Sequence, residues 1–245
     1  RAVAEAAPDG YTLALGNNQT HASNQAMMKA LPYHAIDSFA PIARLASVHH
    51  ALIVPASGAR TLAELVAKGT NGGKVSYAST SVGSASHMIG ESLARRFRMD
   101  ATHVPYRGGG PAVTDTVAGV VDYFVSTWPQ VVTLVREGKL RALAIGAPQR
   151  LPDAPDVPTF DEVGASGVSV DAWFGLWAPA GTPAPIVAKL AEAVVATDNE
   201  PPMQERIWAM GFNAAPLGPA AFAAFQRDEV ARWQALVELT GIRME

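Results

Sequence analysis

The chain has 245 residues, of which 49% are hydrophobic and 17% charged, and its formal net charge is −3 at pH 7. A chain of this size and composition is globular, and its 19 dispersed Lys and Arg residues do not form the clustered basic face that nucleic-acid binding requires. The absence of cysteine excludes disulfides, thiolate metal sites and a cysteine nucleophile, and no apolar run reaches the roughly 18 residues that span a membrane.

Strands and helices are expected to alternate along the chain. Short runs rich in β-branched and aromatic residues, bounded by turn residues, predict strands at 11–15, 42–46, 51–54, 75–78, 103–106, 121–125, 140–145 and 174–178. This alternation is typical of an α/β fold with largely parallel sheets. Because no long linker or internal repeat occurs, two domains would be joined by strands or short crossovers.

The helices are recognised from their start signals and their apolar periodicity. The Thr-x-x-Glu pattern of a capping box occurs at 61–64 and again at 159–162. Pro111 suits the first position of a helix, and Gly241 suits the end of the last helix, which begins near Pro219. Apolar stripes at helical spacing contain Ile89, Leu93 and Phe97, then Ile186, Leu190 and Val194, then Met203, Ile207 and Met210, and finally Phe222, Phe225, Trp233 and Leu236.

The stretch YASTSVGSASHMIGE at 77–91 joins a strand to a helix through small polar residues, with Ser84 as the natural N-cap. The free amides and the dipole of such a helix start bind anions without a formal charge. An ordinary capped loop is the plainer interpretation. A phosphate-binding P-loop would need a lysine, and a hydrolase elbow would need Gly-x-Ser-x-Gly, and neither is present. A nucleophile–base pair of Ser84 and His87 is a further alternative.

Three other strand ends are also polar and almost uncharged, namely GNNQTH at 16–21, RGGGP at 107–111 and STWP at 126–129. Polar loops after parallel strands are where open α/β sheets place ligands. No set of catalytic residues accompanies them, and the six histidines lack metal-ligand spacing, because adjacent residues such as His49 and His50 face opposite ways on a strand. The pattern therefore favours binding over chemistry.

The whole chain resembles one family. The segments PDGYTLALG, LPY, SFAPIARL, VSYASTSVGSASHMIGE, HVPYRGGGPAVTD, GKLRALAI, PDVPTFDEVG, WFGLWAPAGTPAP and ARW…GIR occur in the order typical of the Bug, or TctC-like, substrate-binding proteins of tripartite tricarboxylate transporters. The resemblance implies a two-domain periplasmic-binding-protein-like (type II) α/β fold with a central ligand cleft and crossing hinge strands. The expected domains are 1–50 plus 175–245, and 55–170.

The resemblance also implies a function. We expect a monomeric periplasmic receptor, not an enzyme, that binds a small carboxylate and delivers it to membrane permease subunits, with no cofactor, metal or nucleic acid. A ligand-sensing receptor for a signalling system and a Ser/His hydrolase are the alternatives. The ligand-binding residues implied by the family are Asn17, Asn18, Gln19, Ser79, Thr80, Ser81, Gly83, Ser84, His87, Tyr106, Gly108, Gly109, Ser126 and Thr127.

One departure from the family pattern concerns the start of the chain. The chain opens with Arg1 and without a signal peptide, and PDGYTL, which is internal in family members, occurs at residue 8. Family members place a strand and an aspartate-bearing glycine-rich loop before this point. We therefore expect a truncated or processed sequence in which one wall of the site is not represented.

Overall fold

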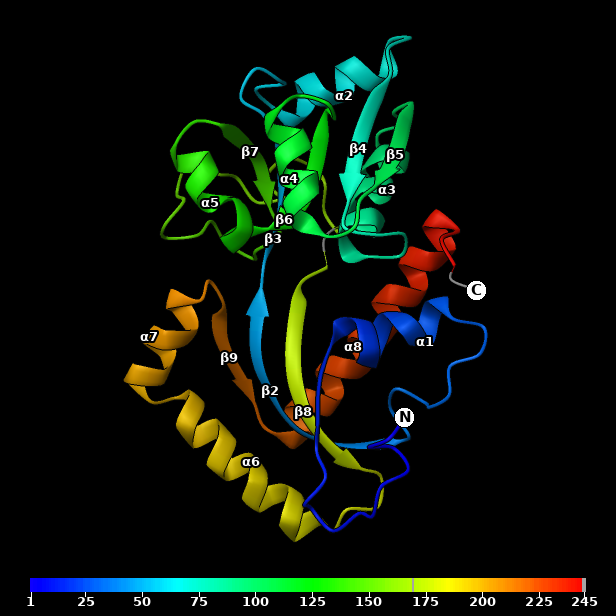
Figure 1. Cartoon of the computed structure of the whole chain (residues 1–245), viewed down its shortest axis with the longest axis vertical. Coiled ribbons are helices and arrows are strands. Elements are labelled where there is room, and N and C mark those ends of the chain that lie inside the picture. Colours follow the sequence, from blue (N-terminus) through cyan, green and yellow to red (C-terminus); the bar gives the residue numbers. More distant parts are fainter. Residues whose placement is uncertain (169, 244–245) are drawn as a thin grey trace. The chain divides into compact units, whose positions relative to one another are not determined.

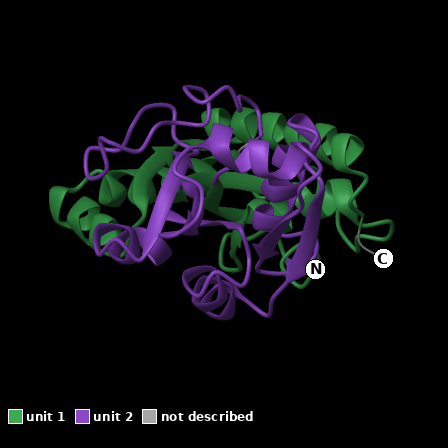
Figure 2. Ribbon diagram, turned by 90° about the horizontal axis from the view of Figure 1, so that it is seen from above, with its two compact units in different colours: residues 1–48, 172–245 green, residues 49–171 purple. Residues whose placement is uncertain are grey.

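The computed structural model of the chain describes residues 1–168 and 170–243 (Figure 1). The chain divides into two compact units, unit 1 with Arg1–Val48 and Ala172–Glu245, and unit 2 with His49–Asp171 (Figure 2). The division into domains expected from the sequence, 1–50 plus 175–245 and 55–170, stays a prediction. None of the described helices has the length and apolar character needed to cross a membrane.

Unit 1 is built on a four-stranded sheet in which every pair is antiparallel. Its order is β1-β8-β2-β9, and its strands are β1 (Ala14–Asn17), β2 (Phe39–Val48), β8 (Ala172–Pro179) and β9 (Asn213–Leu217). The first strand begins at Ala14, so the strand expected at 11–15 is shifted, and Asn17 lies on the strand rather than in the loop after it.

Helices pack on both faces of the unit 1 sheet. Side chains alternate along β8, so that Trp173 and Trp177 contact Phe222 of α8 (Pro219–Thr240) while Ala178 packs with Ala191 of α6 (Ala184–Asp198). The helix α7 (Pro201–Ala209) precedes β9. Two residues of the predicted stripe, Met203 and Ile207, lie on this helix, and only Ile207 is buried, whereas Met210 is its C-cap and is exposed.

Unit 2 is built on a five-stranded mixed sheet of order β5-β4-β6-β3-β7. The strands are β3 (His50–Pro55), β4 (Val75–Ser79), β5 (Ala101–Pro105), β6 (Tyr123–Thr127) and β7 (Leu140–Ile145). β4 is parallel to both β5 and β6, whereas β3 is antiparallel to its neighbours β6 and β7. The expectation of largely parallel sheets is wrong, because β3 lies between β6 and β7 and runs opposite to both, and every pair of the unit 1 sheet is antiparallel.

Helices also cover both faces of the unit 2 sheet. Tyr77 and Tyr123 face α3 (Ala85–Arg96), whereas Ala78 and Phe124 belong to a core with residues of α4 (Gly109–Val117) and α5 (Trp128–Arg136). Because these strands are buried on both faces, their sequences do not alternate between apolar and polar residues. The remaining helix of this unit, α2 (Leu62–Thr70), begins at the expected capping residue, Thr61.

Three local expectations have different outcomes. Gly241 ends α8 in the left-handed conformation with a φ of 70°, as predicted. The capping box at 159–162 forms both of its hydrogen bonds but leads into a turn, not a helix. Pro111 is the third residue of α4, not the first, because Gly108 is the N-cap with a φ of 101°.

Candidate anion-binding site

Three strands of unit 2 end at one edge of the sheet. β4, β5 and β6 run in the same direction, and Ser79 at the end of β4 pairs with Pro105 at the end of β5. Each strand is followed by a helix, α3, α4 and α5 respectively, so three helix starts gather at this edge (Figure 1). The positive ends of the helix dipoles and the first-turn amides of these helices therefore meet where open sheets bind ligands.

The 79–84 loop, which joins β4 to α3, is held by its own hydroxyl groups. Ser84 is the N-cap, since its hydroxyl accepts a hydrogen bond from the amide of His87 at 3.3 Å and donates to the carbonyl of Ser81 at 2.7 Å. Ser86 accepts from the amide of Thr80 at 2.9 Å and lies 2.9 Å from the Ser84 hydroxyl. These contacts fix the backbone without any charged residue.

The same loop leaves backbone donors without acceptors. Within residues 1–168 and 170–243, no acceptor lies within hydrogen-bonding distance of the amides of Ser81, Val82, Ala85 and Ser86. Ser81 and Val82 are exposed. Ser79, by contrast, is fully buried and its hydroxyl donates to the Ser81 carbonyl at 3.0 Å, so this hydroxyl builds the loop and is not available to a ligand.

Two stacked imidazoles lie beneath the loop. His87 on α3 and His103 on β5 have ring centroids 3.7 Å apart and planes 7° apart. The Nδ1 atom of His87 accepts from the amide of Gly83 at 3.1 Å, and the Nε2 atom of His103 lies 2.7 Å from the Ser79 hydroxyl. Burial and the neighbouring His103 lower the pKa of His87 to about 4, and burial lowers the pKa of His103.

The start of α4 presents a second set of free donors. No acceptor in the described part of the chain bonds the amides of Gly109 and Gly110. The Tyr106 hydroxyl donates to Asp115 at 2.7 Å, which leaves it no hydrogen to offer a ligand, and burial together with this hydrogen bond raises the tyrosine pKa to about 12. Gly109 lies against the amide of Gln130, so that an added Cβ atom would be 2.2 Å from its Nε2 atom and the Gln130 side chain would have to move.

The end of β6 completes this edge. The buried hydroxyl of Ser126 donates to the Oε1 atom of Gln130 at 2.9 Å. Thr127 is the N-cap of α5, but its side chain makes no capping hydrogen bond, so its hydroxyl is a free donor there. Of the residues predicted for this unit, the structure therefore brings together 79–84, 106–109 and 126–127.

The remaining predicted residues, Asn17, Asn18 and Gln19, lie in unit 1 at the end of β1. The Oδ1 atom of Asn17 accepts from the amides of Gln19 and Thr20, both at 3.1 Å, and starts the π-helical turn Gln19–Ser23. Asn18 is buried and Gln19 is exposed. Gly16 has no room for a side chain, because an added Cβ atom would lie 2.4 Å from the Nδ1 atom of His21.

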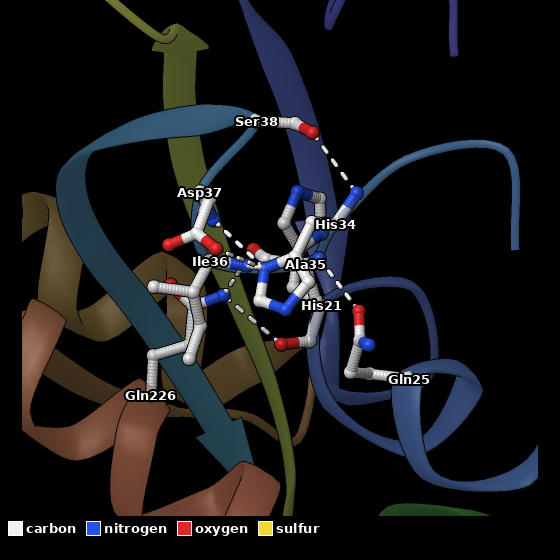
Figure 3. A network of polar contacts seen from close by, with 8 residues as sticks. All are labelled: His21, Gln25, His34, Ala35, Ile36, Asp37, Ser38 and Gln226. Atoms are coloured by element: carbon white, nitrogen blue, oxygen red, sulfur yellow. Dashed lines mark hydrogen bonds and ion pairs between the residues drawn. The ribbon is translucent and has the colours of Figure 1, made fainter.

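A buried amide ties this segment to helix α8 (Figure 3). The Nε2 atom of Gln226 donates to the carbonyls of His21 at 3.0 Å and Ala35 at 2.8 Å, and its Oε1 atom accepts from the Trp177 indole at 3.1 Å. The ring of His21 stacks on Trp177 at 3.6 Å, and burial lowers the His21 pKa to about 4. The loop at 17–19 therefore rests on a fixed support.

The nucleophile alternative lacks its geometry. The Ser84 hydroxyl accepts from the backbone amide of His87, whereas the imidazole Nδ1 atom bonds the Gly83 amide and, among the described residues, no hydroxyl. The serine that does contact an imidazole is Ser79, and it is fully buried. Among the described residues, no three His, Asp or Glu side chains are placed to hold a metal ion.

Three residues of this edge escaped the sequence prediction, namely Ser86, His103 and Gln130. Ser86 could have been found, because it lies within the hydroxyl-rich stretch. His103 reaches the loop only because β5 pairs with β4, which places it opposite Tyr77. Gln130 lies on α5 but meets the start of α4, a contact between two different βα units.

Comparison with known proteins identifies a matching family and several similar solved structures. The model of the family described as "Tripartite tricarboxylate transporter family receptor" (TctC) matches residues 1–242. The periplasmic binding protein BugD is 30% identical, with a TM-score of 0.81 over 99% of this chain and 82% of that chain. MatC (Rpa3494) from Rhodopseudomonas palustris, solved with malate, is 35% identical, with a TM-score of 0.77 over 96% and 82%. R. palustris Rpa4515, solved with adipate, is 27% identical, with a TM-score of 0.85 over 99% and 82%.

These similarities confirm the predicted fold class, a two-domain periplasmic-binding-protein-like α/β fold. The central cleft and the hinge strands included in that expectation stay predictions, as do the individual ligand contacts. The similar structures hold carboxylates, which is the ligand class that an edge rich in free amides suits.

Proposed function

The chain belongs to the TctC family of tripartite tricarboxylate transporter receptors, and from this premise we propose that it binds a small carboxylate in the periplasm and delivers it to the permease subunits of such a transporter. The proposed protein is a monomeric receptor without a cofactor. Its proposed contacts are the residues predicted from the sequence at 79–84, 106–109 and 126–127 in unit 2 and at 17–19 in unit 1, with Ser79, His87 and Tyr106 supporting the loops.

The observation that carries the proposal is the electrostatic character of the strand-end edge. Free amides at the starts of α3 and α4 point to a ligand that accepts hydrogen bonds. The segments 79–84, 105–109 and 126–128 contain no Asp or Glu, and their one charged residue is Arg107. A carboxylate is attracted by such donors, whereas a cation or an uncharged apolar compound gains nothing from them.

We propose a dicarboxylate as the ligand class. Two relatives of similar fold were solved with diacids of different chain length, malate and adipate. A carboxylate at the amides of unit 2 uses only one end of such a molecule, so the other end is free to meet a second set of donors. The amide side chains at 17–19 are our candidates for that set.

Calorimetric titration of the protein tests the proposal. The panel contains malate, succinate, adipate, citrate, benzoate and aspartate, with malate dimethyl ester and glucose as uncharged controls. We expect at least one diacid to bind, the ester to lose the affinity of its parent acid, and NMR to recover the bound acid unchanged after hours. Binding of none of the acids, or turnover of one, contradicts the proposal.

A charge introduced at the N-cap of α3 localises the site. The variant Ser84→Asp places a carboxylate among the donors of the 79–84 loop, so we expect affinity for the bound acid to fall by more than about tenfold through like-charge repulsion. The fold should survive because Asp is a good N-cap.

The matched control is Thr61→Asp, which makes the same change at the N-cap of α2, where the Thr61 hydroxyl accepts from the Glu64 amide at 3.2 Å. This variant should bind as the unchanged protein does. Equal affinity in both variants, with both folded, would place the ligand away from the 79–84 loop.

A further inference from the structure

The stacked imidazoles beneath the 79–84 loop have defined hydrogen-bonding roles. An amide can only donate, so the contact between the Gly83 nitrogen and the Nδ1 atom of His87 requires a lone pair on Nδ1. His87 is therefore neutral, with its hydrogen on Nε2. Protonation of Nδ1 would set two donors against each other at 3.1 Å.

His103 holds the other side of the loop through Ser79. The Ser79 hydroxyl has one hydrogen, which it donates to the Ser81 carbonyl at 3.0 Å. The contact of 2.7 Å between this hydroxyl and the Nε2 atom of His103 is then a bond in which His103 donates. The two rings thus reach the loop at two points, the Gly83 amide directly and the Ser81 carbonyl through Ser79.

The titratable groups around the two rings lie on β4 and α3. Tyr77 on β4 packs on His103 with centroids 5.0 Å apart, and its hydroxyl donates to Glu91 of α3 at 2.8 Å. Glu91 in turn is paired with Arg95 at 2.7 Å. Burial opposes a charge on either imidazole, His103 adds to this opposition at His87, and Glu91 favours the charge on both rings.

We propose that His87 and His103 are positioning residues that hold the 79–84 loop in its ligand-binding shape through uncharged rings, so that protonation of His87 releases Gly83 and weakens ligand binding. This inference rests on the proposed function. Gly83 has a φ of 75° and lies beside the exposed Ser81 and Val82, so a change at its amide moves the free donors of the loop.

Variants of His87 distinguish the contribution of its hydrogen-bond acceptor from that of ring stacking. His87→Phe keeps an aromatic ring for stacking but removes the acceptor, and it should lower affinity for malate or adipate, whichever binds the unchanged protein, by about tenfold. His87→Asn keeps an oxygen near the position of Nδ1 and should recover most of that loss. His34→Phe is the control, because His34 also accepts from a backbone amide, that of Asp37 at 3.1 Å, but lies outside the proposed site.

The pH dependence of ligand affinity distinguishes this role of His87 from a merely structural one. Between pH 7 and 4 the dissociation constant of the unchanged protein should rise more steeply than that of His87→Asn, since ligand protonation is common to both. The variant His103→Gln keeps a donor to Ser79 and should bind the ligand more tightly than His103→Leu. Parallel pH profiles, or full affinity in His87→Phe, would overturn the inference.

A measurement without ligand keeps the two proposals distinguishable. Nitrogen NMR of the ligand-free protein at pH 7 should show His87 with its hydrogen on Nε2 and a Gly83 amide protected from exchange, with protection lost in His87→Phe. If no acid binds but these results hold, the proposed function fails while the loop support stands. A protonated Nδ1 or an unprotected Gly83 amide contradicts the loop support directly.

Discussion

At the residue scale, several close contacts leave no room for a side chain. Gly90 on α3 lies against the buried ring of Tyr77, and an added Cβ atom would be 2.6 Å from its Cδ2 atom. Tyr77 cannot retreat, because Tyr123 stacks on it at 5.2 Å and His103 at 5.0 Å. This one glycine therefore sets the distance between α3 and the sheet beneath it.

We predict that Gly90→Ala lowers the free energy of unfolding by about 1–3 kcal/mol, the usual cost of overpacking a rigid core. The control is Gly110→Ala, because an added Cβ atom there meets nothing within 4 Å. Urea denaturation of both variants measures the difference. Equal stability of the two variants would show that α3 can shift without cost.

The buried histidines predict how stability depends on pH. Burial lowers the pKa of His21 and of His87 to about 4, and also lowers the pKa of the fully buried His50. Between pH about 6.5 and 4 the unfolded chain binds protons that the folded chain does not bind, so stability should fall as pH falls through this window. Urea midpoints at several pH values test this, and His21→Phe should flatten the slope.

At the scale of elements, one helix side chain holds a segment that has little regular structure of its own. Residues 28–38 contain no helix or strand, yet Gln226 on α8 donates to the carbonyls of Ala35 and His21 (Figure 3). Its Oε1 atom also accepts from the Trp177 indole. Gln25 adds a bond to the Ala35 amide at 2.9 Å. The polar groups of this segment are satisfied by side chains instead of by a sheet or helix.

The variant Gln226→Leu should destabilise unit 1 by several kcal/mol. It leaves two carbonyls and one indole N–H buried without partners, and each unsatisfied group costs about 1–3 kcal/mol. Gln234→Leu on the same helix is the control, because Gln234 is exposed. Hydrogen exchange should show faster opening of residues 18–38 in Gln226→Leu alone, and unchanged protection there would contradict the role of this amide.

At the scale of the whole molecule, unit 2 is one continuous stretch of chain whose two ends are bonded to each other. The Nδ1 atom of His49 lies 3.1 Å from both carboxylate oxygens of Asp171, and the Nδ1 atom of His50 lies 2.9 Å from the carbonyl of Val170. Unit 1 is assembled from two segments, 1–48 and 172–245. Unit 1 therefore forms only when two distant segments meet, whereas unit 2 is formed by a single segment.

We predict that the fragment His49–Asp171 folds alone. It contains a complete five-stranded sheet with helices on both faces, and its ends meet, so cutting both connections leaves its core intact. Circular dichroism and a cooperative urea transition are the measurements. A fragment that is unfolded at all temperatures would show that unit 2 depends on unit 1.

The sequence by itself determined the features that depend on neighbouring residues. Residues a few positions apart predict Ser84 as an N-cap, Gly241 as a helix end and the free backbone amides of the 79–84 loop. The resemblance of ordered motifs along the chain was sufficient for the family and the fold class, which the comparisons confirm. Caps, loop chemistry and the order of motifs can be read from the sequence without knowing which strands pair.

Only the tertiary structure decided the features that depend on strand pairing. β3 runs opposite to its partners β6 and β7, a pairing that no local pattern reveals. His103 reaches the loop because β5 pairs with β4, and the buried Ser79 hydroxyl lies within hydrogen-bonding distance of its imidazole. These contacts join residues more than 20 positions apart, and their energy comes from packing and buried hydrogen bonds that exist only once the sheet has formed.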